Sequence, residues 1–411
     1  MYPFLVLMIC LLLADALFEF VLDLLNLKRL KSVLPLEAAG IYDPAKYALS
    51  QKYYKTNQKF SWISTTFGLT LTLILLLSGG FGWLDELLRQ YTRHPVALAL
   101  LFFGIIFLGA EVMGIPFQLY KTFVIEGKYG FNKTTIGLFI ADKVKGLVLG
   151  TIVGGGILSA LVLIFIHTTD SFWWLAWISV SVILLLATMF YASWIIPLFN
   201  KLTPLPEGEL RSAIENYSRK TGFHLNNIFV MDGSKRSAKA NAFFSGLGKN
   251  KKIVLFDTLI QKHSTDELIA VLAHEIGHYQ LKHTRTGLFL SLLQTGLMFF
   301  LLSFFLGNLE LASALGAKEA SFHLNILAFG ILYTPLSKLL SIVMNRMSRK
   351  HEYEADAFAR KTTNAGDLVS ALKKLSVDNL SNLTPHPAYV FVHYSHPPLL
   401  NRIKALQAES G

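Results

Sequence analysis

Seven long apolar segments constrain the fold of this chain more than any other feature of its sequence. A helix needs about 20 consecutive, mostly apolar residues to cross the hydrocarbon core of a bilayer. The segments that meet this requirement lie near residues 3–25, 60–84, 96–120, 146–167, 172–199, 287–306 and 322–346. With 53% hydrophobic and 16% charged residues, the chain is also too apolar for an ordinary soluble protein. The sequence therefore predicts a mainly α-helical integral membrane protein with seven spans.

The net charge of +11 is spread between the apolar segments rather than gathered in one patch. This distribution is typical of membrane orientation, in which cytoplasmic loops carry the excess of Lys and Arg, so nucleic-acid binding is not expected. Residues 26–59 and 121–145 are rich in Lys and Arg, whereas residues 85–95 carry only Arg89 and Arg93. The bias predicts an N-terminus outside the cell, with the first, third and fifth connections and the C-terminal tail in the cytoplasm.

The first apolar segment is predicted to be a retained span. Ala14-Asp15-Ala16 loosely matches a signal-peptide cleavage site, which keeps cleavage open as the alternative. However, no Lys or Arg precedes this segment, and its apolar run continues to Leu27, which favours retention.

The fifth connection, residues 200–286, is the main soluble part of the chain. Its stretch "EGELRSAIENYSRKTG" predicts an amphipathic helix that ends at Gly222. The short runs "NIFVMD", "NAFFSG" and "KIVLFD" are rich in β-branched and aromatic residues, and they predict a small, mostly antiparallel sheet. Ser264 and Glu267 form a capping box that begins a helix over residues 265–283, running toward the sixth span.

The order of these elements divides the chain into four parts. They are a membrane region with its cytoplasmic loops (1–199), a cytoplasmic part with the sheet and the helix over residues 265–283 (200–286), the sixth and seventh spans (287–346), and a C-terminal part that carries Glu352 and His396 (347–411).

The stretch "HEIGH" within the predicted helix is the strongest chemical signal. His274 and His278 lie four residues apart, so both imidazoles share one helix face, and Glu275 lies beside any ion that they bind. This arrangement suits zinc with a neighbouring carboxylate as a base, although the motif could also arise by chance in an amphipathic helix. The single cysteine, Cys10, excludes a thiolate cluster, so a third ligand must come from His, Asp or Glu.

A third ligand is predicted after the seventh span. The extension that metzincins need is absent, because Leu281 and Thr284 occupy its Gly and His positions and His283 is out of register. In "SRKHEYEADAFARK", Glu352 and Asp356 share one helix face. Glu352 would complete a His, His, Glu site and Asp356 would orient a ligand histidine, unless the cluster is only a solvated surface. The hairpin of spans six and seven returns both segments to one side of the membrane.

These motifs together resemble a known family. "AHEIGHYQLKH", "HEYEADAFA" and "HYSHPPLLNRI" are similar to those of the CAAX prenyl protease 1 family, as are "EGKYGFNKTT" (126–135), "PLFNKLTPLPEGEL" (197–210) and "KRSAKANAFFSGLGKNKKIVLFDTLI" (235–260). Members of this family are integral-membrane zinc metalloproteases whose founding members trim isoprenylated C-termini. The HtpX-type heat-shock proteases share the two metal motifs but lack most of the N-terminal spans. The resemblance therefore covers nearly the whole chain.

The resemblance also implies a role for individual residues. The implied assignments are His274, His278 and Glu352 as zinc ligands, Glu275 as general base, Asp356 as orienting partner, His396 as oxyanion stabiliser, Asn241 and Ala242 in a substrate-holding edge strand, and Arg402 in a supporting ion pair. For the last three, a purely structural role is the alternative. One Zn²⁺ per chain, a gluzincin-like α+β protease domain on the cytoplasmic side and a chamber enclosed by the seven spans are implied as well.

Carboxylates also occur inside the spans. Asp15, Glu19 and Asp23 recur every four residues in the first span, and Glu111 lies in the third. Intramembrane carboxylates are costly unless they are paired or face water, so the stripe is predicted to point inward, toward such a chamber. Pairing with lysines near the membrane boundary is the alternative. Among the histidines outside the predicted site, His167 and His323 are expected at the interface, and His386 and His393 match no ligand spacing.

The expected function is zinc-dependent endopeptidase activity near the C-terminus of CAAX-type, possibly isoprenylated, or membrane-associated substrates. A prokaryotic quality-control protease without a lipid requirement is one alternative, since the tail lacks a lysine-bearing retrieval signal and suggests a bacterial inner membrane rather than the endoplasmic reticulum. A transporter or chaperone with a vestigial metal site is another, but a base beside the metal argues against it. Expected partners are a peptide or protein substrate and the bilayer; a monomer is plausible, with the oligomeric state left open.

Overall fold

The protein is described by a computed structural model that covers residues 2–31, 33–34, 40–223, 228–246 and 252–408. Within these residues, seven helical stretches are long and apolar enough to cross a membrane. They are built on α1 (Pro3–Lys28), α2 (Pro44–Leu77), α4 (Pro95–Leu119), α5 (Ile136–Thr168), α6 (Phe172–Phe190), α11 (His283–Ser303) and α13 (Phe322–Thr362). The prediction of a mainly helical, seven-span membrane protein is confirmed.

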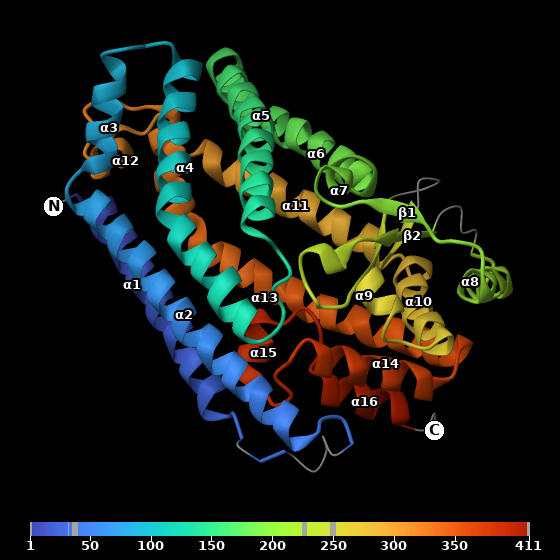
Figure 1. Ribbon diagram of the computed structural model, residues 1–411. Coiled ribbons are helices and arrows are strands. Elements are labelled where there is room, and N and C mark those ends of the chain that lie inside the picture. Colours follow the sequence, from blue (N-terminus) through green and yellow to red (C-terminus); the bar gives the residue numbers. More distant parts are fainter. Residues whose placement is uncertain (1, 32, 35–39, 224–227, 247–251, 409–411) are drawn as a thin grey trace.

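Shorter elements join and extend these helices. Two π-helical segments, η2 (Tyr120–Glu126) and η4 (Tyr191–Ile195), continue α4 and α6, and η4 leads into α7 (Ile196–Phe199). The remaining helices are α3 (Gly80–Arg89), η3 (Thr169–Ser171), α8 (Glu209–Lys220), η5 (Gly233–Lys235), α9 (Asp257–Ile260), α10 (Thr265–Gln280), α12 (Leu309–Ala314), α14 (Ala365–Asp378), α15 (Pro387–His393) and α16 (Leu399–Gln407). The sheet, α10, α14 and α16 gather at one end of the long helices, at the lower right of Figure 1.

The second span was predicted at residues 60–84, which is wrong at both ends. α2 begins at Pro44, where Asp43 caps it, and ends at Leu77. The chain then turns at Gly79, whose φ of 68° suits glycine, and α3 begins. A Cβ on Gly82 would lie 2.1 Å from the carbonyl carbon of Gly316, so this turn packs directly on backbone that follows α12. The residues on both sides of this turn are apolar, so the hydropathy of the sequence does not reveal where the helix ends.

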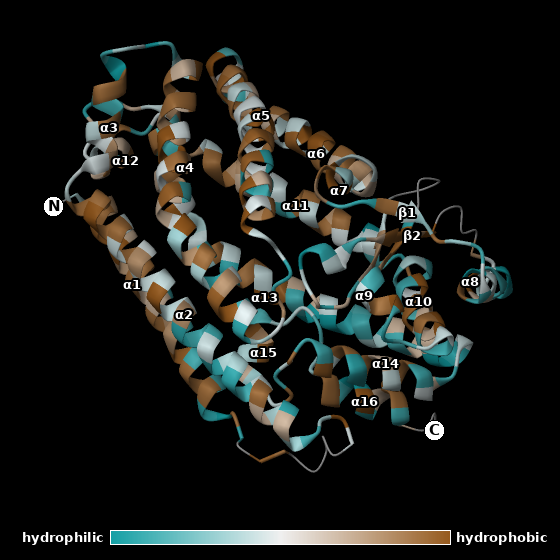
Figure 2. Cartoon of the chain, viewed as in Figure 1, coloured by the Kyte–Doolittle hydropathy of each residue, from teal (hydrophilic) through white to brown (hydrophobic). Residues whose placement is uncertain are grey.

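The longest helix connects the membrane region with the candidate site. α13 has 41 residues, and at 1.5 Å per residue it is about 60 Å long, roughly twice the thickness of a bilayer core. Its last turns therefore extend beyond the apolar part. Figure 2 shows hydrophobic residues dominating the long helices, and hydrophilic residues more frequent around α9, α10, α14 and α16.

The sheet has four strands in the order β1-β2-β4-β3. They are β1 (Leu202–Pro204), β2 (Ile228–Met231), β3 (Ala242–Ser245) and β4 (Lys252–Phe256). β1–β2 and β3–β4 are antiparallel, as expected, whereas β2 and β4 are parallel because β4 passes β3 to lie beside β2. The short β1 was not predicted, and Asn227, the first residue of the run "NIFVMD", lies outside the described residues. β3 is left at the edge of the sheet.

The core of this part lies between the sheet and the helices. α8 ends before Gly222, which has a φ of 65°, as the sequence predicted. From α10, Leu268, Leu272 and Ile276 are buried against apolar residues of β4, α8, α14 and α16. The helix predicted at 265–283 ends at Gln280 instead, because Lys282 adopts a φ of 62° and redirects the chain into α11.

The acidic stripe of α1 is paired across the membrane region. Asp15 and Glu19 both form ion pairs with Lys338 of α13, and Asp23 accepts a hydrogen bond of 2.8 Å from the Trp62 indole. Pairing with lysine was the alternative expectation, but this lysine lies well inside a span rather than at its boundary. The pair also borders a cavity of about 380 Å³, whose lining includes Glu19 and Lys338.

The histidines at span ends differ from one another. His167 is exposed near the end of α5, as expected. His323 is only 1% exposed, and its Nε2 lies 2.7 Å from Asp85 Oδ1, so the prediction of an interfacial residue is wrong for it. The buried carboxylate of a neighbouring helix, which lies 238 positions away in sequence, draws this side chain inward.

Candidate metal centre

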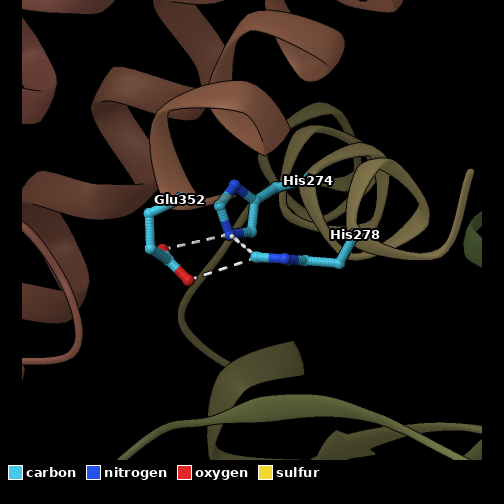
Figure 3. Close-up of side chains that lie close together, drawn as sticks. All are labelled: His274, His278 and Glu352. Carbon is cyan, nitrogen blue, oxygen red and sulfur yellow. Dashed lines mark hydrogen bonds and ion pairs between the residues drawn. The ribbon is translucent and has the colours of Figure 1, made fainter. Parts of the chain in front are cut away.

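Two helices bring three potential metal ligands together. α10 presents His274 and His278, and α13 presents Glu352 from the opposite side (Figure 3). The two Nε2 atoms are 3.1 Å apart, and carboxylate oxygens of Glu352 lie 3.4 Å from His274 Nε2 and 3.2 Å from His278 Nε2. The hairpin of α11 and α13 thus returns both motifs to one place, as the order of spans predicted.

The start of α10 is held in place by a buried acid. Ser264 accepts a hydrogen bond from the backbone N–H of Glu267, and the Glu267 carboxylate accepts one from the backbone N–H of Ser264. The same carboxylate accepts hydrogen bonds from Ser370 Oγ at 2.6 Å and Lys374 Nζ at 2.8 Å, both on α14. The predicted capping box therefore also fastens the ligand-bearing helix to its neighbour.

A close approach of two helices sets the distance between the ligands. A Cβ placed on Gly277 of α10 would lie 3.1 Å from the Cα of Ala355 on α13. Small residues at this crossing let the backbones approach, so imidazoles one turn apart on α10 reach Glu352. A larger residue at either position would push α10 away from α13.

The geometry and chemistry of this set fit a divalent metal ion. Imidazole nitrogens and a carboxylate oxygen bind zinc tetrahedrally at about 2.0–2.2 Å, which places neighbouring ligand atoms roughly 3.3–3.5 Å apart. The observed separations of 3.1–3.4 Å are close to that. Among the described residues, buried Glu352 Oε2 has no hydrogen-bond partner, and the nearest cation, Nη1 of Arg402, lies 3.4 Å away, so this oxygen has a lone pair available for a metal.

A buried ion pair contacts His274 on the side of the ring that faces away from the candidate metal position. Asp356 Oδ1 lies 2.8 Å from His274 Nδ1, so the carboxylate can fix the imidazole with Nε2 free for a metal. Arg402 of α16 donates two hydrogen bonds to Asp356, from Nε at 2.8 Å and from Nη2 at 2.6 Å. Both side chains are buried. The structure thus brings together Asp356 and Arg402, for which the resemblance implied an orienting acid and a supporting ion pair, behind His274.

Comparisons with known proteins match the whole of this architecture. Residues 23–201 match the family described as CAAX prenyl protease N-terminal, five membrane helices, and residues 204–410 match peptidase family M48. The chain is 35% identical to the CAAX prenyl protease 1 homolog of Oryza sativa, over 98% of this chain and 97% of that protein. It is 37% identical to CAAX prenyl protease 1 of Saccharomyces cerevisiae, with coverage of 89% and 86%.

A solved structure agrees with these relatives. The crystal structure of S. mikatae Ste24p matches with a TM-score of 0.94 and 34% sequence identity, covering 99% of this chain and all of that one. The chain belongs to the CAAX prenyl protease 1 family. It is therefore a membrane metalloprotease, and membership of peptidase family M48 implies that it uses a metal ion.

The other predicted site residues of this CAAX prenyl protease 1 family member line one cavity. Its volume is about 660 Å³, and its lining includes Asn241, Ala242, Glu275, His396 and Arg402 beside the three ligands. Ala242 begins β3, which is an edge strand within the part of the chain that the structure describes, and this edge borders the cavity. His396 is 65% exposed, and its Nε2 lies 3.3 Å from Glu352 Oε1. Of the predicted site residues, only Asp356 does not line the cavity.

Burial and neighbouring charges shift the acid–base properties of the site. Burial opposes a charge on His274, but its hydrogen bonds to Asp356 and Glu352 outweigh this effect and raise its pKa to about 9. Burial raises the pKa of Glu275, which suits a group that must accept a proton. Although the His396 side chain is 65% exposed, desolvation on its protein side lowers its pKa against the opposing effect of the Glu352 carboxylate, which favours the neutral imidazole.

One feature of the CAAX prenyl protease 1 site was missed from the sequence. The spacing of His283 fits no metzincin, yet its Nδ1 lies 3.1 Å from Nδ1 of His278, one of the three candidate ligands. Its Nε2 in turn lies 2.9 Å from Glu354 Oε2. The signal was the third histidine in "HEIGHYQLKH", five residues after the second.

Replacing Arg402 with leucine is expected to destabilise the protease part strongly. The change leaves the Asp356 carboxylate buried without its guanidinium partner, which costs about 3–5 kcal/mol. For a unit of this size, that loss lowers the thermal midpoint by roughly 6–20 °C. Thermal unfolding in detergent measures the shift. Arg211→Leu is the control, because it removes ion pairs to the exposed Glu207 and Glu215, each worth about 0–1 kcal/mol, and one hydrogen bond to the Leu205 carbonyl, worth about 0.5–1.5 kcal/mol, but leaves no buried charge unpaired. Equal midpoints for the two variants would contradict the structural role of Arg402.

Proposed function

We propose that the chain is a zinc-dependent endopeptidase that cleaves near the C-terminus of CAAX-type, membrane-associated proteins. The observation that carries this proposal is the His274, His278 and Glu352 triad at the wall of a cavity bordered by a free strand edge. The names of the relatives from rice and yeast support the substrate class. Two imidazoles and one carboxylate favour zinc among divalent ions, with one ion per chain.

Zinc held by these three residues would supply Lewis-acid polarisation of the scissile carbonyl and increase the acidity of water. Glu275 follows His274 directly and lines the same cavity. Its carboxylate is proposed to take a proton from the attacking water as the C–O bond forms. It then delivers this proton to the leaving amine as the C–N bond breaks, so the products are a shortened protein with a new carboxylate and a small peptide.

His396 is proposed to stabilise negative charge that develops on the carbonyl oxygen. Its ring reaches the triad, since Nε2 lies 3.3 Å from Glu352 Oε1, and Ser395 Oγ lies 2.9 Å from its Nδ1. An N–H aimed at the developing oxyanion acts mainly in the transition state, so it would raise kcat more than it changes KM.

The edge strand β3 is proposed to hold the substrate backbone. Among the described residues, β3 pairs only with β4, and its other edge, which begins at Ala242, borders the cavity. The Asn241 side chain accepts a hydrogen bond of 2.9 Å from the Ala242 backbone N–H, so this end of the strand is ordered locally. A substrate that adds as an extended strand is recognised through its backbone, which tolerates varied side chains.

The arrangement in the membrane completes the proposal. The four parts of the chain at 1–199, 200–286, 287–346 and 347–411 would act together, with the N-terminus outside and the active site facing the cytoplasm. The positive-inside bias of the connections supports this orientation. The seven spans would enclose a water-filled chamber, and Glu19 and its partner Lys338, which line the 380 Å³ cavity, would form a polar part of its wall. A bacterial inner membrane, or the endoplasmic reticulum in a eukaryote, stays a prediction.

The test compares two matched peptides that end in a CAAX sequence, one farnesylated and one bare. We expect purified protein to cleave the farnesylated peptide, to lose this activity with a zinc chelator and to regain it when zinc is added. If the zinc-loaded protein instead cleaves both peptides with equal kcat/KM, the result would favour membrane-protein quality control without a lipid requirement. If the protein binds zinc but cuts neither peptide, the proposed substrate class is wrong.

A further inference from the structure

The two ligand histidines are supported in different ways on the side away from the metal position. His274 Nδ1 faces Asp356 directly at 2.8 Å. His278 Nδ1 instead faces another imidazole, that of His283, at 3.1 Å between the two Nδ1 atoms. His283 Nε2 then lies 2.9 Å from Glu354 Oε2. The second ligand therefore also reaches a carboxylate, but through an intervening histidine.

The positions of the protons in this chain follow from metal binding. A neutral imidazole carries one N–H, so His278 with its Nε2 free for the metal must carry the proton on Nδ1. His283 Nδ1 must then accept that hydrogen bond, which places the proton of His283 on Nε2. This N–H points at the Glu354 carboxylate, an acceptor when ionised. With both imidazoles neutral and Glu354 ionised, this is the arrangement that satisfies both hydrogen bonds and leaves a lone pair for the metal.

We infer that His283 and Glu354 are positioning residues that hold His278 in its metal-binding tautomer and ring orientation. The inference rests on the proposed function, because it assumes that His278 is a metal ligand. Partners that hydrogen-bond to a ligand histidine fix its tautomer and raise its basicity, and their loss typically weakens metal binding by about 10- to 100-fold. His283 also lines the 660 Å³ cavity, whereas Glu354 does not, but the role inferred for both residues is exerted on the metal through His278.

The surroundings hold His283 in the required place. It is 7% exposed and is the first residue of α11, immediately after the turn at Lys282. The His351 ring stacks on it, with centroids 4.0 Å apart and an angle of 7° between the planes. Lys350 lies 3.7 Å from the other oxygen of Glu354 and is 75% exposed. Through His283, the start of the sixth span is linked to the ligand helix α10.

A second metal ion is a competing explanation of the same cluster, since donor atoms of His283, His351 and Glu354 lie within 4.8 Å of one another. The stacked rings argue against it. Imidazole lone pairs lie in the ring plane, and two parallel planes do not meet at one ion. A metal on His283 Nε2 would also place the His283 proton on Nδ1, facing His278. His278 would then need its own proton on Nε2, which is incompatible with the triad.

The experiment measures zinc affinity by competition with a chromophoric chelator, using the full chain in detergent without substrate. His283→Leu and Glu354→Leu are expected to weaken zinc binding by about 10- to 100-fold. His283→Gln is expected to stay within a few-fold of wild type, because its amide oxygen can accept from His278 and its NH₂ can donate to Glu354. Lys350→Gln is the matched control, since it removes the solvent-side partner of Glu354 and leaves His283 in place; its affinity is expected to equal that of wild type.

Several outcomes overturn the inference without touching the proposed function. One such outcome is that wild type binds one zinc and cleaves the peptide, while His283→Leu and Glu354→Leu bind zinc as tightly as wild type does. Another is a second zinc equivalent in wild type that His283→Leu lacks, which would make the cluster a metal site. A third is a His283→Gln protein that has the thermal midpoint of wild type but binds zinc as weakly as His283→Leu. That result would contradict the hydrogen-bond chain from His278 through His283 to Glu354. A wild type that binds no zinc would instead defeat the proposed function itself.

Discussion

Glu275→Gln is expected to lower kcat/KM for peptide cleavage by roughly 100- to 10,000-fold, the range that general acid–base catalysis contributes. The amide keeps the size of the side chain but has no lone pair basic enough to take a proton from water. Zinc content is expected to remain that of wild type, because the triad of His274, His278 and Glu352 is complete without Glu275. Cleavage of a fluorogenic CAAX peptide and elemental analysis of the purified protein measure the two quantities.

Glu215→Gln is the matched control for this variant. It makes the same chemical change on the exposed face of α8, where Glu215 only accepts from Arg211 at 2.9 Å, and kcat/KM should not change. A Glu275→Gln protein that holds zinc and still cleaves at the wild-type rate would show that another group carries the proton. Loss of zinc together with activity would show that Glu275 helps to hold the metal.

The pH dependence of wild-type cleavage is a further expectation for the same residue. Burial raises the pKa of Glu275 above its usual 4.5. A general base must be ionised to act, so kcat/KM is expected to fall as pH decreases through this raised pKa. Acid also protonates ligand histidines and releases metal. Zinc content measured at each pH separates the two effects, and a flat profile with zinc retained would contradict Glu275 as the base.

Glu352→Gln is expected to abolish cleavage by removing the metal. An amide is a poor ligand for zinc, and two imidazoles remain. Zinc affinity should fall by more than about 100-fold, because even the loss of an outer hydrogen-bond partner costs about 10- to 100-fold. The variant is isosteric, so the packing of α13 against α10 is expected to persist. Chelator competition measures the affinity, and thermal unfolding without zinc checks that the fold is retained.

Glu352→Asp serves as the comparison for this variant. It keeps the carboxylate but draws it back by one methylene, so we expect zinc affinity between those of wild type and Glu352→Gln. If Glu352→Gln bound zinc as tightly as wild type, the third ligand would have to be another residue. His396 is the nearest candidate, since its Nε2 lies 3.3 Å from Glu352 Oε1.

Features that depend on residues close together in sequence were predictable. Apolar runs long enough for a bilayer predicted seven spans, although the span at 60–84 was misplaced. The four-residue spacing of His274 and His278 placed both on one helix face, and the capping box at Ser264 and Glu267 marked where α10 begins. Resemblance to a family then extended the site to His396 and Arg402, which no local pattern joins to the triad.

Features that depend on contacts between distant segments were not predictable. The parallel pairing of β2 with β4 follows from where β4 returns, and the turn at Gly79 follows from its contact with Gly316. Asp15 and Glu19 meet Lys338 only because α1 and α13 pack with these faces together. His323 is buried because its Nε2 forms a hydrogen bond with Asp85, which lies on another helix.

The sequence by itself determined the membrane class, the helix faces and the candidate ligands, because hydropathy and helical periodicity act over a few turns. Only the tertiary structure decided how the ligands are supported. The sequence places His283 and Glu354 71 positions apart, and they meet because the turn at Lys282 and the close packing at Gly277 set the rotation and approach of α10, α11 and α13. Such rotations depend on the packing of whole helices, which no local spacing records.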